Sequence, residues 1–204
     1  MKIRKEGLPF IFISGLISLL LFLTRLRIFA LAPVMFVVWF FRDPERVVPA
    51  GGDTVLSPAD GKIIDIAETE DEFVGKCTKV AIFMSVFNVH VNRFPVSGVV
   101  VEKRYRPGKF HMAHLGKKTE ANERMMLYIK NEDGTYRVDQ VAGLIARRIS
   151  CFPEVGDTVT AGERMGLIRF GSLLECFMPP SMKVVVNKGD TAVAGETVLG
   201  RKEI

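Results

Sequence analysis

Three residues that could do chemistry together lie far apart in the chain. Ser172 directly follows Gly171, His90 alternates with apolar residues, and Asp60 directly precedes a glycine. A histidine close to a serine hydroxyl can act as its general base. An aspartate can orient that histidine and stabilise its cation. Ser172, His90 and Asp60 could therefore form a catalytic set, which the residue types alone do not favour over structural roles and for which the family resemblance given below is the support.

A structural role remains open for two members of this set. His90 lies between Asn88 and Asn92 at alternating positions, so we expect the three side chains to share one face of a strand. A histidine in such a place can simply be a hydrogen-bonded core residue. Asp60 with the glycine after it is also a standard turn pair, so its carboxylate can serve the backbone alone.

The remaining histidines and the cysteines do not predict a metal site. His111 and His114 are three residues apart, a spacing with which a helix can present two metal ligands. No acidic or sulfur ligand is clearly placed with them, so we interpret residues 105–124 as a loop at the solvent or substrate edge. The three cysteines form no CxxC pair, which predicts reduced thiols rather than zinc or disulfides.

The elements that must position these residues are predicted to be strands. Short β-branched runs separated by Gly, Pro, Asp and Asn follow residue 55. An internal repeat relates residues 155–166 to residues 188–200 with an offset of 33, and residues 51–55 are a partial third copy. Each copy predicts tight turns around a short strand. The repeat resembles the biotinyl and lipoyl carrier fold, which implies a mainly β chain with a carrier-like barrel or sandwich core.

That resemblance also implies a place for the serine. A carrier domain holds its modified lysine at a hairpin tip about ten residues after the last glycine of the turn unit. Counting from Gly162, this position is Ser172. We therefore expect Ser172 at the tip of a hairpin.

The first 42 residues predict a membrane-associated helical hairpin that precedes a globular domain over 43–204. Residues 7–24 hold no charge over 18 positions, which is the lower limit for a membrane-spanning helix, and residues 28–41 are a second apolar run of 14. Positive residues flank both outer ends, which favours the cytoplasmic face of the cell membrane for both. A signal-peptidase site at Ala30-Leu31-Ala32 and a buried hairpin in a soluble protein are the alternatives.

The charge distribution supports a lipid rather than a nucleic acid as partner. Residues 1–42 hold six basic side chains and one acidic one, which accounts for the whole net charge of +5. The rest of the chain then has 22 basic and 22 acidic residues. A nucleic-acid-binding protein would show a basic face on its folded domain. Positive charge beside an apolar segment instead suits anionic lipid head groups.

Five sequence motifs in a fixed order give a specific family resemblance between about residues 40 and 180. They are Phe41-Arg42-Asp43-Pro44, Ser57-Pro58-Ala59-Asp60-Gly61, Met84-Ser85-Val86-Phe87-Asn88-Val89-His90-Val91-Asn92-Arg93, Asn122-Glu123-Arg124 and Gly166-Leu167-Ile168-Arg169-Phe170-Gly171-Ser172. In these motifs the chain resembles the short, type A form of the phosphatidylserine decarboxylase proenzymes.

The resemblance implies an enzyme that makes its own cofactor. The chain would cleave itself between Gly171 and Ser172 into a β chain, 1–171, and an α chain, 172–204, and Ser172 would become a covalent pyruvoyl group. That group would form a Schiff base with phosphatidylserine, which then releases carbon dioxide to give phosphatidylethanolamine. The expected partners are the phospholipid, the membrane and the two fragments themselves, with further homo-oligomerisation left open.

Two positions depart from the longer members of the family. The longer members carry a second histidine three residues after the one that matches His90, whereas this chain has Arg93 there. Arg93 could bind the substrate carboxylate or phosphate bidentately. Leu173 replaces the threonine common in long forms. Asn122 and Arg124 are further candidates for substrate binding, since they could hold the loop that precedes them over the site.

Two other functions compete with this hypothesis. A membrane-anchored carrier or adaptor module would use the same fold without catalysis, but it would have lysine where this chain has Ser172. A pyruvoyl enzyme for a soluble amino acid would not require the apolar hairpin.

Overall fold

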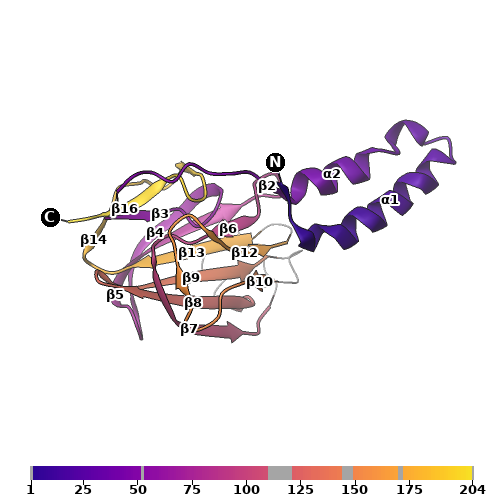
Figure 1. Cartoon of the computed structure of the whole chain (residues 1–204). Coiled ribbons are helices and arrows are strands. Elements are labelled where there is room, and N and C mark those ends of the chain that lie inside the picture. Colours follow the sequence, from indigo (N-terminus) through magenta and orange to yellow (C-terminus); the bar gives the residue numbers. More distant parts are fainter. Residues whose placement is uncertain (1, 52, 110–120, 144–148, 170–171, 204) are drawn as a thin grey trace. The chain divides into compact units, whose positions relative to one another are not determined.

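The computed structural model describes residues 2–51, 53–109, 121–143, 149–169 and 172–203 (Figure 1). The chain forms two compact units, Met1–Glu45 and Arg46–Ile204. The first unit continues past Arg42 because β2 (Arg42–Asp43) pairs antiparallel with β1 (Lys2–Ile3).

The first unit is a hairpin of two apolar helices. It comprises the 3₁₀ turn η1 (Lys5–Gly7), α1 (Leu8–Phe22), the 3₁₀ turn η2 (Arg27–Phe29) and α2 (Ala32–Phe40). Each α-helix has a proline in its first turn, where no backbone N–H is required. Gly7 lies against Phe41, since a Cβ on Gly7 would be 2.6 Å from the ring carbon Cγ.

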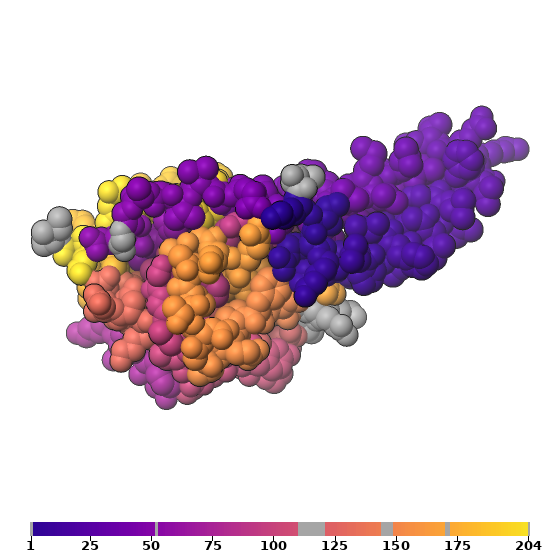
Figure 2. Space-filling view, viewed as in Figure 1, coloured from indigo at the N-terminus to yellow at the C-terminus, as the bar shows by residue number. Residues whose placement is uncertain are grey.

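The polarity of this unit is inverted relative to a water-soluble hairpin. Ser14 and Ser18 are buried, whereas Phe12, Leu20 and Ile28 are 70%, 65% and 81% exposed. Figure 2 shows the unit, in indigo, as an elongated body. In the part of the chain that the structure describes, one helical stretch, Lys5–Phe22, is long and apolar enough to cross a membrane. An apolar outside with small polar residues inside is typical of helices that pack in lipid.

The second unit is built around a curled eight-stranded antiparallel sheet, which confirms the predicted mainly β fold. The strand order is β11-β7-β8-β9-β13-β5-β4-β15. Their bounds are β4 Gly61–Asp71, β5 Gly75–Met84, β7 Gly98–Arg106, β8 Arg124–Asn131, β9 Gly134–Ala142, β11 Thr158–Val159, β13 Ser172–Met178 and β15 Thr191–Ala192.

Two three-stranded antiparallel sheets complete this unit, with orders β10-β12-β6 and β14-β16-β3. Their bounds are β3 Thr54–Leu56, β6 Val91–Arg93, β10 Ile149–Cys151, β12 Arg164–Ile168, β14 Met182–Val184 and β16 Val198–Lys202. The strands β10, β11 and β12 match β14, β15 and β16 at the offset of the sequence repeat. The repeat thus corresponds to two equivalent sets of strands.

The equivalence extends over the whole second unit, whose two halves are related by a pseudo-two-fold axis in the strand order. The eight-stranded order reads the same from both ends when β11, β7, β8 and β9 are matched with β15, β4, β5 and β13. One half, strands β6 to β12 over residues 91–168, is continuous in sequence and is here called the inserted half. The other, the flanking half, consists of residues 54–84 and 172–202. The chain therefore re-enters the flanking half at Ser172.

The two faces of the large sheet differ in chemistry. Alternate residues of the central strands, among them Tyr136, Val138, Leu174 and Cys176, point into the main apolar core. The intervening residues of the same strands form a small apolar cluster around Leu173, together with buried charged side chains described below. Successive side chains of a strand point to opposite faces, so each central strand contributes to both layers.

Candidate active site

Ser172 is the first residue of β13 and is completely buried. It lies directly opposite Met84 of β5 on one side and Ala142 of β9 on the other. Its side chain points to the same face as Leu174, into the main core. Among the described residues its hydroxyl oxygen Oγ has no hydrogen-bond partner. A buried hydroxyl without a partner is costly, and such groups in native proteins often have a functional role.

The expected hairpin tip is wrong for Ser172. The strand before it, β12, pairs with β10 and β6, whereas β13 pairs with β5 and β9. The strands β12 and β13 therefore belong to different sheets and are not the two strands of one hairpin. Gly171 itself lies outside the described residues. The count of ten from Gly162 identified the residue but not its surroundings, because the chain leaves the repeat before it reaches β13.

His90 lies in the connection that leads from β5 to β6, and its side chain is completely buried. Its ring atom Nδ1 is 3.0 Å from the carbonyl oxygen of Asn88. A carbonyl oxygen only accepts, so Nδ1 carries the proton and, in the neutral ring, Nε2 has the lone pair. That is the tautomer in which His90 can accept a proton through Nε2.

A hydrogen-bonded turn fixes the backbone in front of this histidine. The Asn88 side-chain oxygen accepts from the Ser85 N–H at 2.9 Å and from the Ser85 hydroxyl at 2.8 Å. Asn88 and His90 thus precede the strand, and only Asn92 lies within β6. The prediction that all three share a strand face is therefore wrong, because the Asn88 side chain closes the turn.

Asp60 binds other partners than the one predicted for it. Its two carboxylate oxygens accept hydrogen bonds from Arg46 at 2.9 and 2.8 Å, and Oδ1 also accepts from the Ala194 N–H at 2.8 Å. The carboxylate therefore ties the segment before β3 to the second repeat. A role for Asp60 in orienting His90 stays a prediction.

Arg93 is buried and contacts both repeats. Its guanidinium NH1 donates to the Gly162 carbonyl at 2.7 Å, and its Cδ would lie 3.0 Å from a Cβ on Gly195. Both glycines have positive φ, of 81° and 74°, which favours glycine in each repeat. In this arrangement Arg93 stabilises the packing of the two turns against each other, and its predicted substrate contact stays a prediction.

Asn122 lies next to the serine through the backbone of β9. Its amide Nδ2 donates to the Ala142 carbonyl at 2.8 Å, and the Ala142 N–H donates to the Glu123 carbonyl at 2.9 Å. Ala142 is the residue opposite Ser172. Asn122 therefore fixes the end of β9 beside the serine, and its predicted role in substrate binding stays a prediction.

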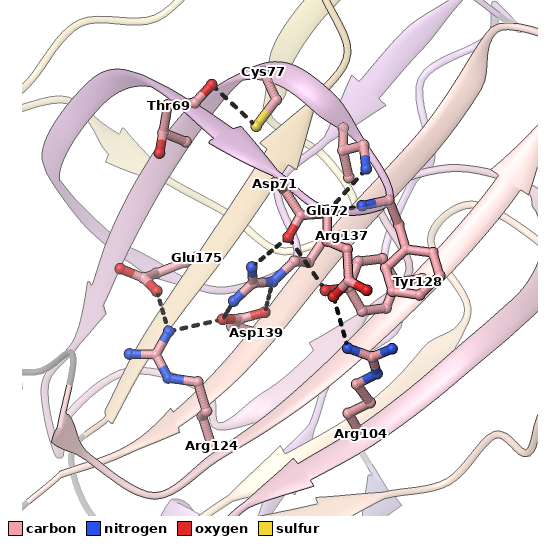
Figure 3. Close-up of polar contacts among 12 residues, drawn as sticks. Thr69, Asp71, Glu72, Cys77, Arg104, Arg124, Tyr128, Arg137, Asp139 and Glu175 are labelled. Carbon is pink, nitrogen blue, oxygen red and sulfur yellow. Dashed lines mark hydrogen bonds and ion pairs between the residues drawn. The ribbon is translucent and has the colours of Figure 1, made fainter.

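Arg124 belongs to a buried network of charges (Figure 3). The network lies on the opposite face of the sheet from the Ser172 side chain, since Arg124 pairs with Val141 whereas Ser172 pairs with Ala142. Its NH1 atom donates to Asp139 at 2.9 Å and to Glu175 at 3.1 Å. Arg137 in turn binds both Asp139 and Asp71. The network connects β8, β9 and β13 with the end of β4.

The pKa values in this network reflect burial against pairing. Burial raises the pKa of Glu175, and the nearby Asp139 carboxylate adds to the rise. Burial also opposes ionisation of Asp71, but the N–H groups of Val74 and Phe73, with Arg137, keep its pKa below the ordinary value. Desolvation and the proximity of Arg124 lower the pKa of Arg106. Burial thus opposes ionisation of Glu175, whereas hydrogen bonds and Arg137 favour ionisation of Asp71.

A second polar pair beside Ser172 was not anticipated from the sequence. Gln140 donates from Nε2 to the Asn92 side-chain oxygen at 2.8 Å, and both residues are buried in the main core. Alternation along β9 puts Gln140 on the same face as Tyr136 and Val138. A glutamine in the core-facing phase of an apolar strand is the signal that could have identified it.

Across the described ranges, no group of three or more His, Cys, Asp or Glu side chains is placed to hold a metal ion. His111 and His114 lie outside those ranges. Burial raises the pKa of the Cys176 thiol to about 12, which keeps this neighbour of the site protonated.

Comparison with known proteins identifies relatives along nearly the whole chain. The family model for phosphatidylserine decarboxylase matches residues 34–200. The phosphatidylserine decarboxylase proenzyme of Syntrophus aciditrophicus (strain SB) is 48% identical over 205 residues, which cover 97% of this chain and 96% of that protein. The proenzyme of Symbiobacterium thermophilum is 46% identical over 208 residues, covering 98% of this chain and 95% of the relative.

Proposed function

Because the chain belongs to the phosphatidylserine decarboxylase family, we propose that Gly171–Ser172 is the bond it cleaves and that Ser172 becomes its pyruvoyl group. The chain is a proenzyme that converts phosphatidylserine into phosphatidylethanolamine and carbon dioxide. One observation carries the assignment to Ser172. Its hydroxyl is buried at the first position of a central strand and, among the described residues, has no hydrogen-bond partner.

Self-cleavage at this bond balances with one water molecule and one ammonia. The Ser172 oxygen bonds to the Gly171 carbonyl carbon, the peptide C–N bond breaks, and the hydroxyl proton moves to the Ser172 nitrogen. Loss of the Ser172 α-proton then expels the Gly171 carboxylate and leaves a carbon–carbon double bond on residue 172. Tautomerisation and addition of water release ammonia and leave the ketone. The fragments are 1–171 and 172–204.

When formed, the pyruvoyl group supplies an electron sink for decarboxylation of an amino acid head group. The chain's own residues hold it in place. Strand β13 is hydrogen-bonded on both sides, so the new chain end at residue 172 remains fixed beside Met84 and Ala142. The fit is chemical as well as spatial, since the hydroxyl that disappears in the reaction lacks a hydrogen bond in the described part of the chain.

His90 is the general base in this proposal. Its Nδ1–H is bound by the Asn88 carbonyl, so Nε2 can take the hydroxyl proton of Ser172. Arg93 occupies the position of the second histidine in longer relatives, and its guanidinium contact with the Gly162 carbonyl supports a structural role there. One histidine then serves both the cleavage and the protonation that follows loss of carbon dioxide.

His90→Gln is expected to slow self-cleavage, phosphatidylethanolamine formation or both by about 10²–10⁴-fold, because glutamine cannot take up the proton. Time courses of fragment appearance and product formation measure the two steps separately. Ser85→Ala is the matched control, since it loosens the turn before His90 without removing a titratable group. A His90→Gln protein that retains wild-type rates in both steps would remove His90 from the site.

The experiment that tests the assignment is an intact-mass measurement of the purified full-length chain in detergent. Two fragments are expected, and the smaller, 172–204, should be blocked to Edman degradation. The same sample should form phosphatidylethanolamine from phosphatidylserine in mixed micelles. A chain that stays intact at 22.8 kDa after long incubation, or that is cut at another bond, would contradict the assignment to Gly171–Ser172.

The helical unit supports a proposal for how the enzyme meets its substrate. We propose that the hairpin enters the bilayer from the cytoplasmic side and returns, since Lys2 and Arg4 precede α1 and Arg42 follows α2. Domain roles then divide between a membrane hairpin, 1–42, and a decarboxylase domain, 43–204. Further association of the processed heterodimers stays a prediction.

A carrier-like core is also part of the proposal. The pseudo-two-fold axis and the two repeated turn units support a relationship with biotinyl and lipoyl domains. The alternative of a carrier without catalysis is set aside by membership in the decarboxylase family.

A further inference from the structure

We propose that Gln140 is a positioning residue for self-cleavage: its side-chain oxygen Oε1 accepts the Ser172 hydroxyl, and Asn92 holds the amide in that orientation. The inference rests on the proposed cleavage at Gly171–Ser172. It concerns the uncleaved precursor: in the structure the two atoms are not hydrogen-bonded, and the bond forms when the Ser172 side chain turns toward Gln140 before the attack.

The first argument is the position of two unpaired polar atoms on one face of the sheet. Ser172 lies opposite Ala142 and Gln140 lies opposite Leu174, so Ser172 and Gln140 are diagonal neighbours. Diagonal pairs are about 7–8 Å apart, within reach of a long side chain. Ser172 Oγ and Gln140 Oε1 are both buried, and neither has a hydrogen-bond partner among the described residues. One can donate and the other can accept.

The second argument is that the amide of Gln140 has a fixed orientation. Its Nε2 atom donates to the Asn92 oxygen at 2.8 Å. The Asn92 amide in turn contacts the sulfur of Met84 at 3.5 Å, and Met84 lies directly opposite Ser172. Gly166 closes the other side, because a Cβ there would be 2.7 Å from Nε2. With its nitrogen committed to Asn92, Gln140 has its oxygen available for another donor.

The third argument comes from the pseudo-two-fold axis. Gly166 of the inserted half corresponds to Gly200 of the flanking half, and a Cβ on Gly200 would lie 2.9 Å from the sulfur of Met178. Met178 thus occupies the place of Gln140. Val55 occupies the place of Asn92, since both face the same bulged glycine. The equivalent place in the flanking half is therefore filled by apolar side chains. The polar pair lies in the half where it is close to Ser172.

The chemical role follows from what an amide can do. An amide oxygen does not take up the proton at neutral pH, so Gln140 cannot replace the base. It can hold the Ser172 hydroxyl in one orientation until the proton passes to His90 Nε2, after which the oxygen is free to attack. A fixed hydroxyl directs its oxygen lone pair toward the Gly171 carbonyl carbon more often. The bond from Oγ to that carbon then forms, and the peptide C–N bond breaks, with a smaller loss of entropy.

The variants Gln140→Met and Asn92→Val give the inserted half the residue types that the flanking half has at the equivalent positions, Met178 and Val55. Because the same packing exists around Gly200, both are expected to fold. We expect the two fragments to appear about 10–100-fold more slowly in Gln140→Met and more slowly than wild type in Asn92→Val. The measurement is a gel time course after synthesis of the full chain in detergent, with the urea midpoint of each variant measured in parallel.

Two controls separate positioning from packing. Met178→Leu makes a comparable change at the equivalent place of the flanking half, and Val138→Ala removes core volume from the same face of β9. Both should cleave at the wild-type rate relative to their stability. Wild-type cleavage in Gln140→Met overturns the proposal, and so does slowing that merely follows the urea midpoint, as in Val138→Ala.

The outcomes also separate this inference from the proposed function. If Gln140→Met fails to fold, Asn92→Val decides, and cleavage at the wild-type rate in that variant overturns the proposal. A wild-type chain that never cleaves at Ser172 would instead contradict the proposed function, whatever the glutamine variants do.

Discussion

A Ser172→Ala chain is expected to remain a single species of about 22.8 kDa and to form no phosphatidylethanolamine above background. The methyl group of alanine offers neither the oxygen that attacks the Gly171 carbonyl nor the leaving group of the elimination. Both the cleavage and the cofactor are therefore lost in one change. Intact-mass spectrometry and a lipid product assay measure the two losses on the same sample.

The same substitution should not damage the fold. The Ser172 oxygen is buried and, in the described part of the chain, has no hydrogen-bond partner, so its removal relieves a desolvation cost instead of breaking a bond. We expect the urea midpoint to equal or exceed that of an uncleaved wild-type chain. Ser57→Ala is the matched control, since Ser57 is also buried but donates to the Ala59 carbonyl, and it should leave cleavage intact. Fragments from Ser172→Ala would disprove the mechanism.

The sequence predicted the elements that repeat themselves and missed what the topology adds. The offset of 33 between two Gly-Asp turn units anticipated β11 and β12 with their counterparts β15 and β16. It could not show that residues 91–168 are inserted into the other half. The hairpin prediction for Ser172 failed for this reason, since β13 pairs with strands from both halves.

The candidate site likewise contains residues that the sequence alone could indicate and residues that only the fold brings together. Family motifs made Ser172 and His90 candidates, because the residue type alone carries their chemistry. Gln140 escaped notice since its partner Asn92 is 48 residues away and the two meet only through the fold. The roles of Asp60 and Arg93 in the reaction stay predictions, and the sequence could not reveal their partners Arg46 and the Gly162 carbonyl.

Arg124 would connect the two fragments that the proposed cleavage at Gly171–Ser172 creates. It pairs with Asp139, which would lie with it in the large fragment, and with Glu175, which would lie in the small one. The three side chains are 6%, 0% and 8% exposed for Arg124, Asp139 and Glu175. Buried charges are costly unless they remain paired. Removing the Arg124 cation should therefore destabilise the fold by more than the intact ion pairs contribute to its stability.

Arg124→Met is expected to lower the free energy of unfolding by about 3–5 kcal/mol, because it leaves two buried carboxylates with fewer partners. The Ser172→Ala background keeps the chain in one piece, so that urea unfolding is not complicated by dissociation of the fragments. Arg104→Met is the matched control: Arg104 lies on the neighbouring strand β7, and its ion pairs with Glu72 and Glu102 are half exposed. It should change the urea midpoint little.

The loss caused by Arg124→Met should depend on pH in a defined direction. The folded pKa of Glu175 is already raised by burial and by Asp139, and removing Arg124 raises it further. A carboxyl group whose pKa is raised in the folded state makes the protein less stable as the pH rises. The loss begins at the unfolded pKa, near 4.5, and continues through the pKa of the folded state. The difference from the Ser172→Ala parent should therefore grow as the pH rises above the unfolded value near 4.5. Adding Glu175→Gln should flatten this dependence and restore part of the stability, whereas a pH-independent loss would show that Glu175 does not depend on Arg124.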